Sequence, residues 1–270
     1  MKKIIRLFLV LIGGWMGIIL LLSAVFAVNP VEFFTAARNN IVINVAWLFL
    51  LYGLILSTIH FSIVREGGTG IKDLGLSLDK KVIFKTLRNL LIVFFLFGCY
   101  LFLLLKSGHT VFKSADLYYV LTEVLKAVLF GLLFAFVEEI FFRGYVYTRL
   151  LDDIPSPLAI IVVNLLFACL HLFRPGNPPF KVMYFIGLFL VGTILSIIYI
   201  KTRSLWMPVS VHMGWVACMY LLASPLFDFN RRICGYSVLF GLENCPVAGI
   251  AGYTVVLLTG FMVVNIRKDW

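Results

Sequence analysis

Two adjacent carboxylates and an arginine interrupt an apolar stretch of the chain, "FAFVEEIFFRGY" at residues 134–145. An ionisable side chain inside a membrane span costs free energy, of order 3 kcal/mol on insertion scales, so such residues are usually paired, cavity-lining or functional. Glu139 and Arg143 are four residues apart, which places them on one helix face and predicts a charge-assisted pair. Glu138 lies about 100° further round the helix and therefore needs another partner.

Two histidines are candidates for that partner. His171 in "NLLFACLHLF" and His212 in "VSVHMGWVA" each lie inside a later apolar run, whereas His60 is interpreted as a packing or interfacial residue and His109 as a solvated loop residue. Counted from the inner ends of their helices, Glu138 and His171 lie at depths of roughly 18 and 21 Å and His212 at roughly 10 Å. One cavity that opens to the cytoplasm could hold all three side chains.

These side chains are suited to hydrolysing an amide bond. In an apolar site near Arg143, Glu138 can act as a general base that accepts a proton from water. Histidine can donate to a carbonyl oxygen or hold the attacking water. The sequence contains neither G-x-S-x-G nor H-E-x-x-H, so it indicates neither a serine triad nor an ordinary zinc protease.

The elements that must position these residues are membrane helices. The chain is 62% hydrophobic with a mean hydropathy of +1.04, and its apolar runs are continuous rather than alternating. We predict an all-α fold, a polytopic membrane helical bundle of about eight transmembrane helices. The predicted spans are residues 7–28, 41–63, 88–105, 118–140, 158–173, 182–200, 206–224 and 248–266. The fourth is expected to continue to about Leu150, before Pro155 and Pro157.

Lysine and arginine predict the orientation of the bundle. With both termini in the cytoplasm, the inside segments hold 14 of these residues and the outside loops 7. This bias accounts for the net charge of +10 through anionic membrane lipids, without nucleic acid. The apolar stretch after "MKKIIR" is longer than a usual signal-peptide core, so we interpret it as a retained first helix.

The spans group into three parts. Residues 1–117 hold the N-terminal helices and a basic loop, residues 118–222 hold the motifs, and residues 223–270 hold an outside loop and the last helix. The basic loop, "REGGTGIKDLGLSLDKKVIFKTLRN", predicts an interfacial segment on the inner leaflet, with substrate binding as the alternative. Cys234 and Cys245 share the outside loop and could form a disulfide if that side is oxidising.

At these motifs the sequence resembles the CPBP intramembrane metalloprotease-like family, also called Abi. That family groups type II CAAX prenyl proteases with bacteriocin-processing and self-immunity proteins. Its E-E-x-x-x-R motif matches "EEIFFR" at residues 138–143, and its F-x-x-x-H motif matches "FACLH" at residues 167–171. Its third motif begins at His212, but Val216 stands where the family usually has asparagine. The resemblance covers about residues 118–222, and "DLGL" at residues 73–76 is also similar to the family.

The resemblance implies a glutamate-dependent peptidase. Glu138 and His171 would activate water, and His212 would stabilise the oxyanion. The other implied site residues are Glu139 and Arg143, which would shape the site, and Phe167, which would line it.

Val216 lacks the donor that this position normally supplies to the oxyanion. Asn164 lies seven residues before His171 on the same helix face and could supply it instead. The alternative is that Asn164 makes a hydrogen bond between helices.

The sequence therefore predicts an intramembrane endopeptidase in a bacterial inner membrane. Its substrate would be a membrane-associated peptide or protein, CAAX-type or bacteriocin-like, cut near the cytoplasmic face. No cofactor is expected; the alternative is zinc held by Glu138, His171 and His212. Two other functions are a non-catalytic binding or immunity protein and a proton-coupled transporter. The absence of a sequence repeat argues against the transporter.

Overall fold

The computed structural model describes residues 1–172, 176–230, 238–242 and 245–265, without the side chain of Arg38. Within these ranges the regular secondary structure is helical apart from one short sheet. The longer helices are α1 (Lys2–Val25), α3 (Ile41–Arg65), α4 (Lys80–Lys106), α5 (Leu117–Glu139), α7 (Ser156–Leu170), α8 (Pro178–Thr202), α9 (Trp206–Ala223) and α11 (Ile250–Asn265). The short elements are α2 (Phe33–Asn39), α6 (Thr148–Leu150), and the strands β1 (Thr110–Phe112) and β2 (Phe227–Phe229). The 3₁₀ turns are η1 (Pro30–Glu32), η2 (Ile71–Leu74) and η5 (Pro246–Ala248).

The predicted all-α polytopic bundle is confirmed. Six helices of the described chain are long and apolar enough to cross a membrane: α1, α3, α4, α8, α9 and the continuous helical stretch Leu117–Leu150. The other two predicted spans correspond to α7 and α11, which are apolar but shorter. At 15 residues, α7 is about 22 Å long, so it crosses only part of a hydrocarbon core of about 30 Å.

The third helix begins earlier than its hydrophobicity predicts. The sequence places its start at residue 88, but α4 starts at Lys80, because the side chain of Asp79 accepts a hydrogen bond from the backbone N–H of Val82 at 2.8 Å. Four of the six basic residues of the predicted interfacial segment therefore lie in the first turns of α4: Lys80, Lys81, Lys85 and Arg88. Only the 3₁₀ turn η2 and its flanking residues remain as a connecting loop.

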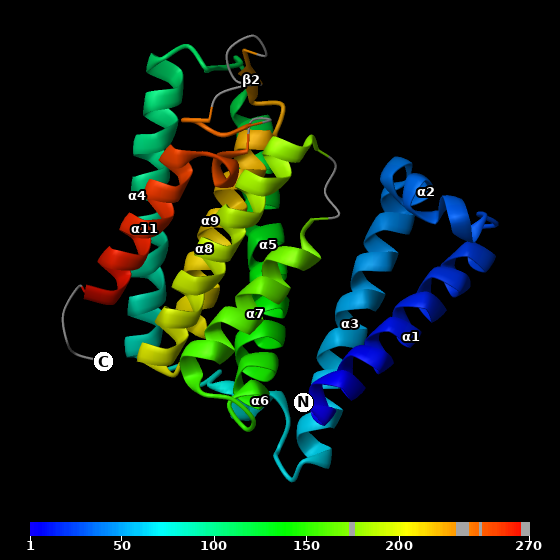
Figure 1. Cartoon of the computed structure of the whole chain (residues 1–270). Coiled ribbons are helices and arrows are strands. Elements are labelled where there is room, and N and C mark those ends of the chain that lie inside the picture. Colours follow the sequence, from blue (N-terminus) through cyan, green and yellow to red (C-terminus); the bar gives the residue numbers. More distant parts are fainter. Residues whose placement is uncertain (173–175, 231–237, 243–244, 266–270) are drawn as a thin grey trace.

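Figure 1 shows two groups of helices. The helices α4, α5, α8, α9 and α11 form a bundle in which α9 packs against both α5 and α4, and α7 lies along α8. The helices α1 and α3 form an antiparallel pair, closed by α2, that contacts the bundle mainly through α3. Few side chains of this pair are buried, which is the pattern of helices that face lipid.

Close packing of α5 against α9 depends on one glycine. A Cβ at Gly131 would lie 2.7 Å from the carbonyl oxygen of Met213, closer than real Cβ contacts. Glycine at this position lets the two backbones approach, and the approach brings the end of α5 to His212.

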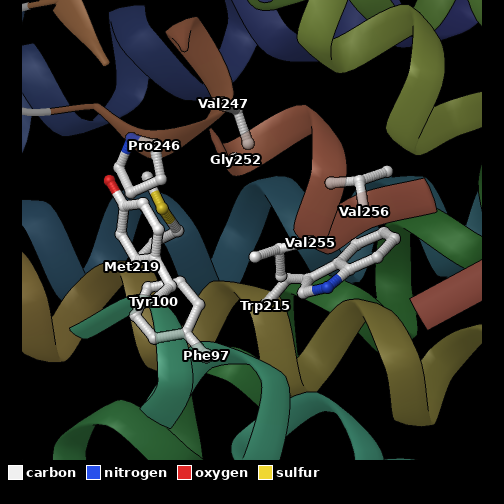
Figure 2. Close-up of a pocket in the computed structure, with 9 residues that line it drawn as sticks. All are labelled: Phe97, Tyr100, Trp215, Met219, Pro246, Val247, Gly252, Val255 and Val256. Atoms are coloured by element: carbon white, nitrogen blue, oxygen red, sulfur yellow. The ribbon is translucent and has the colours of Figure 1, made fainter. Parts of the chain in front are cut away.

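The opposite side of α9 packs against α4, η5 and α11 around a small apolar cavity of about 20 Å³. Figure 2 shows Phe97, Tyr100 and Pro246 together at one end of it and Trp215 and Val256 at the other. A cavity of this size has room for about one water molecule.

Candidate active site

The site is built where α5 ends. Glu138 and Glu139 are the last residues of α5, and the chain continues directly into a π-helix, Ile140–Tyr147, that carries Arg143. A π-helical segment inside an α-helix is uncommon and is often found at functional sites. All eight residues of this segment are buried, so the surrounding helices hold it on every side.

Glu139 and Arg143 form the predicted ion pair, with Nη1 of Arg143 2.8 Å from Oε1 of Glu139 and both side chains fully buried. Arg143 also donates from Nη2 to the carbonyl oxygen of Gly192 at 2.8 Å and to Oδ1 of Asn164 at 3.2 Å. A buried guanidinium is tolerated only when its donors are paired. Through these bonds Arg143 links the π-helix to α7 and α8.

Asn164 belongs to this buried frame. Its Nδ2 lies 3.2 Å from Oγ of Ser196 on α8, while its Oδ1 accepts from Arg143. Its side chain is fully buried. The geometry corresponds to the hydrogen bond between helices, not to a donor presented to substrate.

Sequence reasoning missed two residues of the frame, Gly192 and Ser196. A Cβ at Gly192 would lie 2.6 Å from Oδ1 of Asn164 and 3.3 Å from Nη2 of Arg143, so only glycine leaves room for these side chains. The available signal was a pair of small residues four positions apart in "GTILS", on one face of a predicted span.

His212 bridges the two glutamates. Its Nδ1 lies 2.8 Å from Oε1 of Glu139 and, since a carboxylate can only accept, Nδ1–H is the donor. Its Nε2 lies 3.7 Å from Oε2 of Glu138. Oε1 of Glu139 thus accepts from both Arg143 and His212, and this carboxylate fixes the orientation of the imidazole.

His171 approaches Glu138 from the other side. It follows the last residue of α7, Leu170, and its Nδ1 lies 2.7 Å from the carbonyl oxygen of Phe167. That carbonyl also can only accept, so Nδ1 carries the proton. Its Nε2 lies 3.8 Å from Oε1 of Glu138. The ring of Phe167 packs against both imidazoles, with centroids 4.6 Å from His171 and 6.0 Å from His212.

Glu138 differs from Glu139 in its access to the surroundings. Its side chain is 23% exposed and that of His171 is 29% exposed, whereas Glu139 is fully buried. The distances of 3.7 and 3.8 Å from Glu138 to the two imidazoles are too long for direct hydrogen bonds and suit a shared water molecule. The arrangement can therefore hold a water molecule beside an accessible carboxylate.

The two remaining histidines, a possible metal site and the predicted cysteine pair complete the comparison with the sequence. His60 packs against Phe61, with ring centroids 5.5 Å apart, and His109 against Phe240 at 4.4 Å. In the described ranges no group of three His, Cys, Asp or Glu side chains has a geometry that could hold a metal ion. Cys234 lies outside the described residues, so its pairing with Cys245 stays a prediction.

Comparison with known families agrees with the motifs. Residues 120–218 match the family model described as type II CAAX prenyl endopeptidase Rce1-like. The matched segment contains the two glutamates, Arg143, and both site histidines, so the resemblance is confirmed over this segment. No match was found among curated proteins or among solved structures.

Proposed function

We propose that residues 120–218, as a type II CAAX prenyl endopeptidase-like domain, hydrolyse a peptide bond of a membrane-associated peptide or protein. The observation that carries this proposal is the position of Glu138. Its carboxylate lies between two imidazoles, with Nε2 atoms at 3.7 and 3.8 Å, beside a fully buried ion pair that fixes one of them. The general class of peptidase is supported by the family match.

Water activation falls to Glu138 and His171. Because Nδ1 of His171 donates to Phe167, the Nε2 of the neutral ring carries a lone pair that faces the carboxylate. A water molecule between them can donate one hydrogen bond to each. Glu138 takes a proton as the water oxygen attacks the carbonyl carbon, and a tetrahedral intermediate forms.

Oxyanion stabilisation falls to His212. Glu139 accepts its Nδ1–H and so fixes the orientation of the ring. In the imidazolium form of His212, Nε2–H is a donor to the developing oxyanion. The intermediate then collapses, the C–N bond breaks, and the proton held by Glu138 passes to the leaving nitrogen. Atoms and charge balance, since water supplies both the hydroxyl group and the proton.

Zinc has no step in this mechanism. Among the described residues no metal-holding group was found, and the two imidazoles face different oxygen atoms of Glu138. Strong chelation tests this directly: turnover by the proposed mechanism survives it, and loss of turnover that zinc restores would overturn it.

The experiment that tests the function is quantitative mass spectrometry of new protein termini in membranes. Cells would make the wild type, Glu138→Gln, or the control His109→Gln at matched levels. The glutamine is isosteric but cannot accept the proton, and we expect loss of on the order of 10²-fold or more in product. His109 lies in a loop and belongs to no part of the mechanism.

The two outcomes separate peptidase from binding protein. Termini that are present with wild type and with His109→Gln but lost with Glu138→Gln establish proteolysis and identify substrates. Identical termini in all three, with a cellular phenotype that survives Glu138→Gln, would replace the proposal by a non-catalytic binding or immunity role. Val216, which lacks a donor, is the observation that favours this second candidate.

A further inference from the structure

We propose that a basic pocket at the shared end of α1 and α3 binds the phosphate of an anionic phospholipid. The pocket has a volume of about 270 Å³. Its lining residues are Lys2, Lys3, Arg6, Ser62, Arg65, Glu66 and Tyr145. They come from the start of α1, the end of α3 and the π-helix, so the pocket lies where the peripheral pair of helices meets the segment that carries Arg143.

The lining carries four cations and one carboxylate, and that carboxylate is already occupied. Glu66 accepts a hydrogen bond from the hydroxyl of Tyr145 at 2.9 Å and from Nε of Arg149 at 2.5 Å. Lys3 is engaged as well, with its Nζ 3.0 Å from Asp152 and 3.7 Å from Glu66. The local carboxylates are thus held by their own partners.

Three cations of the pocket are left for a ligand. In the described part of the chain, Lys2, Arg6 and Arg65 have no ion pair. Guanidinium groups match the oxygens of a phosphate in two-point hydrogen bonds. The free positive charge and the donor types select an anion that carries several oxygens.

The position of the pocket selects a lipid as the source of that anion. Lys2 and Arg65 are the first and last residues of membrane-spanning helices, so the pocket lies at the level of the headgroups. The apolar side chains of Ile5, Leu9 and Phe61 next to it are 55%, 66% and 68% exposed. They offer acyl chains a surface that continues from the phosphate site, which a free phosphate ion would not use.

A neighbouring pocket provides an internal comparison. It has a volume of about 410 Å³ and shares Lys3 and Glu66 with the basic pocket, but Asp73 and Asp152 also line it. Its carboxylates therefore outnumber its cations, Lys3 and Arg149. The charges of the lining residues therefore favour an anion in the basic pocket but not in the neighbouring pocket.

The test is a lipid titration of the purified full chain in detergent, followed by native mass spectrometry. The probes are dioleoylphosphatidylglycerol and, as the zwitterionic control with the same chains, dioleoylphosphatidylcholine. The variant Arg6→Gln/Arg65→Gln removes two pocket cations. Its matched control, Lys80→Gln/Lys81→Gln, removes two exposed cations at the start of α4 that do not line the pocket.

We expect one tightly retained phosphatidylglycerol on the wild type and on the lysine control. The arginine variant should bind it on the order of ten-fold more weakly, since each cation near an anionic headgroup contributes a several-fold effect. Thermal unfolding in detergent checks that both variants are folded. If the arginine variant is unfolded, the single variants Arg6→Gln and Arg65→Gln should each show a smaller loss in the same direction.

Three results would overturn the proposal. They are equal retention of the two lipids, an equal loss in the lysine control, and displacement of the lipid by millimolar inorganic phosphate, which would make free phosphate the ligand. The proposal does not depend on the peptidase mechanism, because Glu138 does not line the pocket. We expect Glu138→Gln to bind the lipid as the wild type does, so failure of either proposal is distinguishable from failure of the other.

Discussion

At the scale of single residues, two adjacent glutamates occupy contrasting environments. Glu139 is fully buried and bonded to Arg143 and His212, while Glu138 is 23% exposed and lies between two imidazoles. The cause is the helix itself, because a step of one residue turns the side chain by about 100°. One carboxylate therefore points into the bundle as part of a fixed frame, and the other points toward the site where substrate would lie.

Val216 leads to a prediction about activity. It is one turn beyond His212 on α9 and is partly buried, but it has no polar group to offer. Loss of one oxyanion donor elsewhere costs about 2.7–4 kcal/mol, so Val216→Asn should raise the turnover number by about 100- to 1000-fold, with little change in KM. The measurement is steady-state cleavage of a substrate identified from the membrane termini.

The isosteric change Val216→Thr is the control for this gain, because a hydroxyl is too short to reproduce the reach of the amide. Equal turnover in wild type and Val216→Asn would mean that His212 alone serves the oxyanion, or that no oxyanion forms.

Asp73 leads to a prediction about pH. The hydroxyl of Thr69 donates to it at 2.5 Å and the backbone N–H of Thr69 at 2.7 Å, and these bonds lower the pKa of Asp73 below its ordinary value of 3.8. A carboxyl whose pKa is lowered by folding stabilises the folded loop above its ordinary pKa, and this contribution disappears as the pH falls through the lowered value.

Amide hydrogen exchange at Thr69 should therefore be protected near neutral pH and should lose that protection in strong acid, after correction for intrinsic rates. In Asp73→Asn the protection should be weaker and independent of pH. A pH dependence that persists in Asp73→Asn would assign the effect to another group.

At the scale of elements, the site depends on the positions at which the α-helical geometry of α5 and α7 stops. The α5 helix becomes a π-helix immediately after Glu139, and α7 ends at Leu170, immediately before His171. A helix end frees backbone carbonyls, and His171 uses that of Phe167 to hold its proton on Nδ1. Both changes occur at motif residues, so the motifs encode local backbone geometry as well as chemistry.

Gly192 leads to a prediction about the frame between α7 and α8. In Gly192→Ala the new Cβ would meet Asn164 and Arg143 at 2.6 and 3.3 Å, so both side chains must shift. We expect destabilisation of about 1–3 kcal/mol, the usual range for overpacking, together with reduced turnover. Thermal unfolding and cleavage assays of the same preparation measure the two effects.

Gly98→Ala is the matched control for this prediction. Gly98 lies in α4, and nothing lies within 4 Å of the position that a Cβ would take there, so alanine should be neutral or slightly stabilising. Equal melting temperatures for the wild type and both variants would show that the frame is not tightly packed at Gly192.

At the scale of the whole molecule, a buried bundle supports the site and a lipid-exposed pair of helices stands beside it. In an apolar 18-residue stretch of each helix, half or more of the residues are buried in the bundle helices α8 and α9, whereas only 11% are buried in α1 and in α3. The pair is joined to the bundle through the contacts of Glu66 with Tyr145 and Arg149. Polar contacts at the membrane boundary thus help to tie the lipid-exposed pair to the bundle.

The charge distribution leads to a prediction about orientation. If Lys and Arg orient the helices, the C-terminus and the loop before α4 lie in the cytoplasm, and the β1–β2 sheet lies outside. In a bacterial host, green fluorescent protein fused to the C-terminus should fluoresce, and alkaline phosphatase inserted after residue 108 should be active. The reverse pattern would contradict the orientation and place the basic pocket outside.

Much of this protein could be inferred from its sequence alone. Long apolar runs determine membrane helices because the bilayer leaves the backbone no other way to satisfy its hydrogen bonds. The spacing of Glu139 and Arg143 determined their pairing, because helix geometry is local. The motifs identified the histidines that lie near Glu138, because a motif is defined by residue types and their order, which can be read from the sequence.

Only the tertiary structure decided the rest. The start of α4 is set by its N-cap residue, Asp79, and the hydropathy of the sequence does not reveal such a cap. The π-helix after Glu139 has no characteristic spacing of apolar residues by which the sequence could predict it. Gly192 and Ser196 contact Arg143 because α8 packs against α7 and the π-helix. Asn164 accepts a hydrogen bond from Arg143 for the same reason. A contact between helices is set by how their surfaces fit together, and each helix's own sequence specifies only its half of that fit.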